Sequence, residues 1–75
     1  MDSPATRITT AYRVQVASEL DGSWAAALDG WRLSTHGGRT ALERGDVDQA
    51  ALYGLLVRLR DLGLVLLAVE RLDSS

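Results

Sequence analysis

The sequence contains no cysteine, lysine, phenylalanine or asparagine, and it has only one proline and one histidine. Without cysteine, disulfide bonds and thiolate metal sites are excluded. The stability of so short a chain must then come from a well-filled core, from self-association or from both. The 75 residues are enough for one domain, and 47% apolar with 24% charged residues is typical of a globular one.

The chain has no large excess of positive or negative charge, and its formal net charge is −2. The eight basic residues are scattered along the chain, whereas a nucleic-acid-binding domain normally carries a basic stripe. We therefore expect no nucleic-acid partner.

Long apolar runs are also missing. The longest covers residues 64–69, far short of the ~18 residues of a membrane-spanning helix. The N-terminus lacks the basic region and apolar run of a signal peptide. We expect a cytoplasmic protein without membrane contact, made of a flexible segment 1–9, one domain over 10–72 and a frayed C-terminus over 73–75.

The first half of the domain reads as strands around one short helix. From residue 11 to 16 the pattern alternates, with Tyr12, Val14 and Val16 on one side, which predicts a half-buried strand. Three alanines at 25–27, between a capping segment at Asp21 and a glycine at position 30, favour a short helix. Residues 31–36 and 40–44 then predict a hairpin about Gly37-Gly38, which Gly45 is expected to end.

A longer helix is predicted over residues 47–62. Asp46 at the N-cap and Gln49 three residues later form a capping box, and Gly63 ends the helix. The predicted core stripe is Leu52, Leu55, Leu56, Leu59 and Leu62. The other face has little charge, and Gly54 in a helix interior costs about 1 kcal/mol relative to alanine, so something should offset this cost. Close approach of a second element is one candidate.

Residues 64–69 are apolar at both odd and even positions, which point to opposite faces of a strand. A strand with one solvated face should alternate, so this pattern predicts a strand that is covered on both faces.

Together these elements predict an α+β fold of β-α-β-β-α-β order. The expected architecture is a ferredoxin-like sandwich, with two helices on one face of a four-stranded antiparallel sheet. The connection between the first two strands is near the minimum of about a dozen residues for a crossover. If the short helix does not form, the rival is a three-stranded meander followed by the long helix and the last strand.

The run from Asp48 to Leu64, with Trp24 and Asp29-Gly30 upstream, resembles a group of small uncharacterised actinobacterial-type proteins. The resemblance extends in order from Tyr12 to Leu72 and implies fold and source rather than activity. Those proteins often have a longer Gly-Pro stretch before the helix. The bias toward Ala, Gly and Arg, whose codons are GC-rich, likewise suggests a high-GC bacterial source.

No catalytic, cofactor or metal site is expected. His36 stands beside a glycine turn, and no Gly-x-Ser-x-Gly nucleophile elbow accompanies it. Asp46 and Asp48 offer too few oxygens for a hard cation, which wants six or more, and helix capping explains both.

The leading hypothesis is a non-enzymatic interaction module that self-associates as a homodimer through the open sheet face. The expected interface residues are Val65, Leu67 and Val69, with Tyr53 and Val57 as a second surface.

Two alternatives stay open. One is a dimeric barrel that binds or converts a hydrophobic small molecule, as polyketide cyclases and cofactor-independent monooxygenases do, with Trp24, Trp31, His36 and Arg39 lining the cavity. The other is a regulatory partner of a larger enzyme, which would dock through Tyr53 and Val57.

Overall fold

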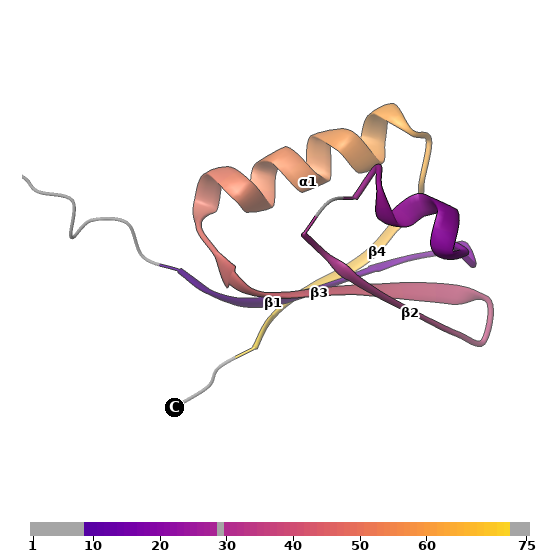
Figure 1. The fold of residues 1–75 in the computed structure, drawn as a ribbon, viewed down its shortest axis with the longest axis horizontal. Helices are drawn as coiled ribbons and strands as arrows, with labels where there is room; N and C mark the ends of the chain where they lie inside the picture. The colour runs from indigo at the N-terminus through magenta and orange to yellow at the C-terminus, as the bar shows by residue number, and fades with distance from the viewer. Residues whose placement is uncertain (1–8, 29, 73–75) are drawn as a thin grey trace, which may run out of the picture.

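A computed structural model describes residues 9–28 and 30–72, so most of the predicted flexible N-terminus and the predicted frayed C-terminus lie outside the described residues. In chain order, the elements are β1 (Thr10–Val16), the 3₁₀ helix η2 (Gly22–Ala25), β2 (Arg32–His36), β3 (Arg39–Val47), α1 (Gln49–Asp61) and β4 (Leu66–Leu72) (Figure 1).

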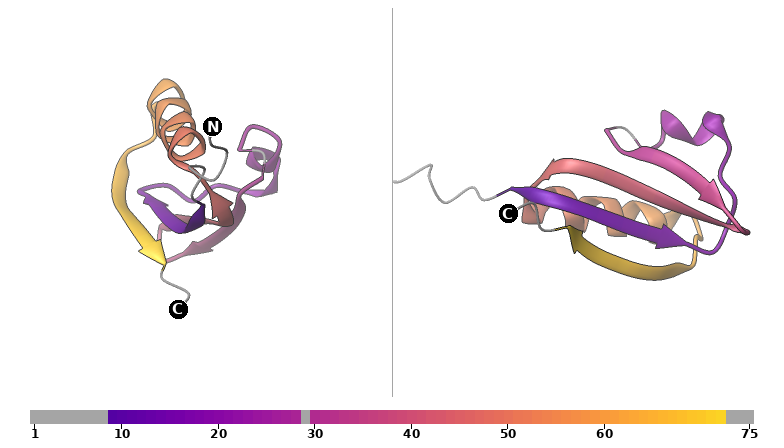
Figure 2. Two further views of the ribbon diagram at one scale, coloured as in Figure 1. Left: turned by 90° about the vertical axis from the view of Figure 1, so that its left-hand side faces the viewer. Right: turned by 90° about the horizontal axis from the view of Figure 1, so that it is seen from below.

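The four strands form one sheet in the order β2-β3-β1-β4, and every neighbouring pair is antiparallel. Helix α1 lies across one face of this sheet and leaves the other face open (Figure 2). The predicted α+β class and four-stranded antiparallel sheet are confirmed. The rival meander is wrong, because it requires β1 beside β2, and β2 pairs with β3 alone.

The predicted first helix does not form. Its segment holds one 3₁₀ turn, which Asp21 caps by accepting a hydrogen bond from the Ser23 backbone N at 3.0 Å. The intrinsic preference of the alanines is weak against tertiary packing. Here Leu28 and Trp31 are 1% and 8% exposed, so the chain turns early to place both in the core. With one α-helix among the described residues, the two-helix ferredoxin-like order is not confirmed.

The hairpin about Gly37 and Gly38 is confirmed, with both glycines at positive φ and with His36 opposite Arg39. The prediction that Gly45 ends the second strand of the hairpin is wrong. Strand β3 continues to Val47, and its register with β1 shifts between Thr10 and Tyr12. This irregularity accompanies the burial of Val47, which is 1% exposed.

Helix α1 begins at Gln49, two residues later than predicted, and its N-cap is Asp48 rather than Asp46. The Asp48 Oδ1 accepts a hydrogen bond from the Ala51 backbone N at 2.8 Å. At the other end, Gly63 adopts a φ of +75° and its N–H bonds to the Arg60 carbonyl, as the predicted glycine stop requires.

The core lies between α1 and the covered face of the sheet. Of the five leucines in the predicted helix stripe, three are buried, Leu56 is partly buried and Leu62 is 40% exposed. The buried apolar residues are Val14, Val16, Leu20, Leu28, Trp31, Leu42, Val47, Leu52, Leu55 and Leu59.

The prediction that the last strand is covered on both faces is wrong for the single chain. Strand β4 is an edge strand in which Leu66 and Leu67 are 45% and 48% exposed. A helix is about 10–12 Å across, whereas neighbouring strands lie about 4.8 Å apart, so one helix covers about two strands of a sheet. The apolar side chains of β4 are left without a cover.

Candidate functional site

The open face of the sheet carries a row of paired charges that crosses all four strands. Arg13 on β1 donates through Nε to Glu43 on β3 at 2.7 Å and through Nη1 to Glu70 on β4 at 3.1 Å. Arg32 on β2 reaches Glu43 at 3.4 Å. The strand register places Arg13 directly opposite both glutamates, and Arg32 opposite Glu43.

Hydrogen bonding within this row shifts two pKa values. The bond from Arg13 is the main reason that the pKa of the Glu43 carboxyl lies below its usual value, and Arg32 adds to the effect. The bonds to Glu43 and then Glu70 raise the pKa of Arg13. Two arginines and two glutamates thus leave the row electrically balanced, and the centre of the open face is polar.

The five predicted interface residues are all exposed, and they belong to α1 and the β4 edge rather than to the charged row of the open face. Val65, Leu67 and Val69 are in or beside β4, and they are 61%, 48% and 40% exposed. Tyr53 and Val57 lie on α1 and are 58% and 46% exposed.

We call this region, together with Leu66, the α1–β4 surface. A largely apolar groove of about 420 Å³ is lined by the C-terminal half of α1 and the start of β4. Its lining residues are Leu56, Leu59, Arg60, Gly63, Leu64 and Leu66. Tyr53 and Val57 share a helix flank with Leu56 and Arg60, because residues three or four apart are neighbours on a helix.

The four residues predicted to line a ligand cavity do not meet in one cavity of the single chain. Trp24 is partly buried and packs against the core, and Trp31 is itself in the core. His36 and Arg39 belong to the β2–β3 hairpin, where they line a separate hollow of about 290 Å³ with Gln15, Ser34, Gly37 and Ala41.

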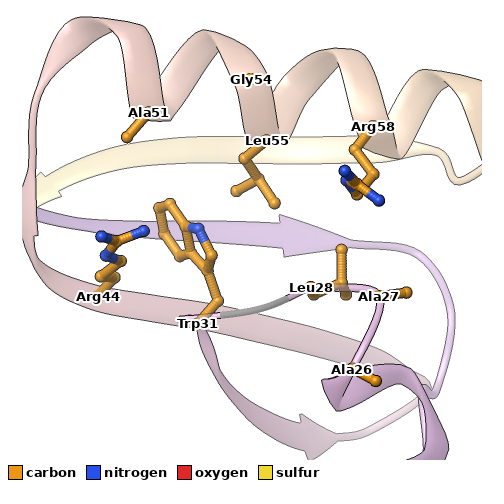
Figure 3. A pocket seen from close by; sticks show the side chains of 9 residues that line it. All are labelled: Ala26, Ala27, Leu28, Trp31, Arg44, Ala51, Gly54, Leu55 and Arg58. Carbon is orange, nitrogen blue, oxygen red and sulfur yellow. The ribbon is translucent and has the colours of Figure 1, made fainter.

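A third hollow, which the sequence analysis did not predict, lies between α1 and the segment that joins η2 to β2 (Figure 3). We call it the Trp31 hollow. Its volume is about 270 Å³, and two arginines, Arg44 of β3 and Arg58 of α1, reach it from different elements. The other lining residues are Ala26, Ala27, Leu28, Trp31, Ala51, Gly54 and Leu55. These residues are far apart in sequence, so no local motif could have joined them.

Within residues 9–28 and 30–72, no group of three or more His, Asp or Glu side chains could hold a metal ion. The one α-helix of this part of the chain has 13 residues, and no described helix is long and apolar enough to cross a membrane.

These features define a small α+β protein with an open antiparallel sheet, a charged sheet face and an apolar edge. Residues 11–70, which run from β1 into β4, match the family described as "Domain of unknown function (DUF8691)". The chain therefore belongs to the DUF8691 family. No curated protein and no solved structure matches it.

Proposed function

We propose that this chain is a non-enzymatic interaction module that forms a homodimer through its α1–β4 surface. One observation carries the proposal. Among the described residues, every large apolar side chain that is exposed lies between positions 53 and 69, in α1, β4 or the turn that joins them. Exposed large apolar side chains that gather in one part of the chain, rather than being scattered singly, favour an interaction site there.

A second copy of the chain fits this surface because β4 is a sheet edge. No described strand pairs with its outer backbone groups, and an exposed apolar edge is a template for pairing with another strand. Two β4 strands related by a two-fold axis would pair antiparallel, and the same surface would serve both copies. The exposed side chains of α1, Tyr53 and Val57, would then extend the contact from the strand to the helix.

The sequence analysis proposed an interface on the open sheet face. The β4 edge is a better interface than the centre of that face. Stacking two open faces would remove Arg13, Glu43 and Glu70 from water, and burying paired charges carries a large desolvation penalty. Pairing at the edge leaves this row solvated.

The test is the molar mass in solution, measured by light scattering after size exclusion at two concentrations. We expect the mass of two chains for the wild type and of one chain for Leu67→Glu, because a carboxylate in the apolar contact would be desolvated without a partner. Circular dichroism checks that the variant is folded. The matched control is Ser34→Glu, which places the same charge at an exposed position of the opposite edge strand, β2, and should leave the dimer intact.

A wild type that is monomeric at both concentrations would overturn self-association. It would favour instead a different protein as the partner of the α1–β4 surface. A folded Leu67→Glu variant that remains dimeric would show that the interface lies elsewhere.

A further inference from the structure

We propose that the Trp31 hollow binds a small organic anion, a carboxylate with a compact apolar body, held by Arg44 and Arg58 beside the Trp31 indole. None of its lining residues belongs to the α1–β4 surface, although Val57 of that surface adjoins Gly54 and Arg58 on α1. The proposal is therefore independent of the proposed dimer.

The two arginines come from separate elements and flank one ring. Figure 3 shows the Trp31 indole rising between the Arg44 side chain on one side and Arg58, which descends from α1, on the other. A guanidinium presents a planar fork of N–H donors that matches the oxygens of a carboxylate or phosphate. Two such forks beside one hollow form a site for an anion.

Both guanidinium groups retain free donors. Arg58 has no ion pair with any residue that the structure describes. Arg44 donates only through Nε, to Asp46 at 3.3 Å, and the Asp46 side chain is 80% exposed. Arg13, by contrast, is held by two glutamates. The arginines of the hollow therefore have donors available for a ligand.

Two glycines, Gly30 and Gly54, lie beside the arginines of the hollow. Gly30 has a φ of +89°, which favours glycine, and a Cβ added there would lie 3.1 Å from Arg44 Nη1, so the guanidinium packs closely against this glycine. At Gly54 an added Cβ would meet nothing within 4 Å, so no packing within the chain explains a glycine in the middle of α1. Among the described residues, no second element makes the close approach that was one candidate explanation for Gly54. Gly54 lines the hollow and keeps it open.

Size and lining narrow the ligand class. The volume of about 270 Å³ is below the roughly 300–1,000 Å³ of sites for drug-sized ligands. Ala26 is exposed and Ala27 and Ala51 are half-buried, so these small side chains offer apolar contact to the ligand body, which a bare inorganic ion would leave unused. A ring or short branched chain that bears one carboxylate combines a negative charge for the arginines with a compact body for the apolar lining.

The test is an amide and indole NMR titration of the full chain with benzoate, with benzamide as its neutral analogue and with inorganic phosphate. We expect benzoate to give saturable shifts at the Trp31 indole N–H and the Gly54 amide, benzamide to give none, and phosphate to bind more weakly than benzoate. Arg58→Gln should raise the benzoate Kd about tenfold or more, as the loss of charge-assisted hydrogen bonds predicts.

The matched control is Arg60→Gln, which removes the same charge from the same helix end but from the other flank, where Arg60 pairs with Asp61. Its benzoate Kd should equal that of the wild type. Leu67→Glu should also bind benzoate normally, which separates this proposal from dimer formation. Three results would overturn the site: no saturable shift with benzoate, equal shifts with benzamide, or equal losses in Arg58→Gln and Arg60→Gln.

Discussion

Thr40 is the one buried polar residue among those described, and its hydroxyl is fully used. It accepts a hydrogen bond from the Leu20 backbone N at 2.8 Å and donates to the Ser18 carbonyl at 2.6 Å. The side chain thereby fixes the segment that leaves β1 against β3, at the start of the connection that carries η2.

Replacing Thr40 by valine keeps the shape and removes both bonds. We expect the free energy of unfolding to fall by about 1–3 kcal/mol, the range for buried backbone groups that lose their partner. Urea denaturation measures the change. The control is Thr35→Val on β2, opposite Thr40 in the register but exposed, which should stay within about 0.5 kcal/mol of the wild type. Equal stability of Thr40→Val and wild type would show that water replaces the lost bonds.

Glu43 makes stability depend on pH in a defined direction. Its pKa is lowered in the folded state, chiefly by the bond from Arg13, so the folded protein binds fewer protons at this site than the unfolded chain. The stabilisation is fully present above the unfolded pKa, near 4.5, and is lost as the pH falls through the lower folded value.

Thermal unfolding at pH 7 and pH 3 tests this dependence. Glu43→Gln should melt below the wild type at pH 7, and the two should converge toward pH 3. Asp61→Asn, which removes an exposed carboxylate paired only with its neighbour Arg60, should show no such convergence. A gap between Glu43→Gln and wild type that is unchanged at low pH would contradict the assignment to the carboxylate.

At the scale of residues, the sequence predicted which side chains of β1 face the core, but it did not predict which residues form ion pairs. The alternation of Tyr12, Val14 and Val16 identified the inward face of β1 correctly, and both valines are fully buried. The bonds of Arg13 join residues 30 and 57 positions apart, and they depend on a register that local patterns do not determine.

At the scale of elements, the start of α1 shows how tertiary packing overrides a local motif. Asp46 and Asp48 are both good N-cap residues, and Asp46 also offered a capping box with Gln49. The burial of Val47 between them extends β3 three residues past its predicted end at residue 44, so that the helix can begin only after Asp48. Burial of one apolar side chain thus decided which aspartate caps the helix.

The two aspartates form a matched pair for mutation. Asp48→Ala should lower the free energy of unfolding by about 1 kcal/mol, because the Ala51 N–H loses its acceptor. Asp46→Ala removes only a bond from an 80% exposed carboxylate and should change stability by less than about 0.5 kcal/mol. Urea denaturation compares them, and a larger loss for Asp46→Ala would place the cap where the sequence pattern first suggested.

Strand β4 shows the limit of pattern reading at this scale. Apolar residues at both its odd and its even positions identified a strand correctly. The same pattern, however, is expected for a strand buried within its own chain and for one that binds another chain. The position of β4 at the edge of the sheet, which follows from the crossover through α1, distinguishes the two cases.

At the scale of the whole molecule, the proposed dimer links thermal stability to concentration. If the folded state is the dimer, a tenfold rise in protein concentration should raise the Tm by roughly 3–5 °C through mass action. Leu67→Glu should show a Tm that is independent of concentration. Differential scanning calorimetry over a hundredfold range measures both, and a constant wild-type Tm would argue for a folded monomer.

The sheet order has a further consequence for assembly size. The two edges of the sheet differ, because β4 is apolar whereas β2 is five residues long and exposes Arg32, Ser34, Thr35 and His36. Fibres grow when each added copy presents a fresh adhesive edge. A copy that has paired through β4 offers only the short polar edge of β2, so strand addition ends at two copies and growth into a fibre is blocked.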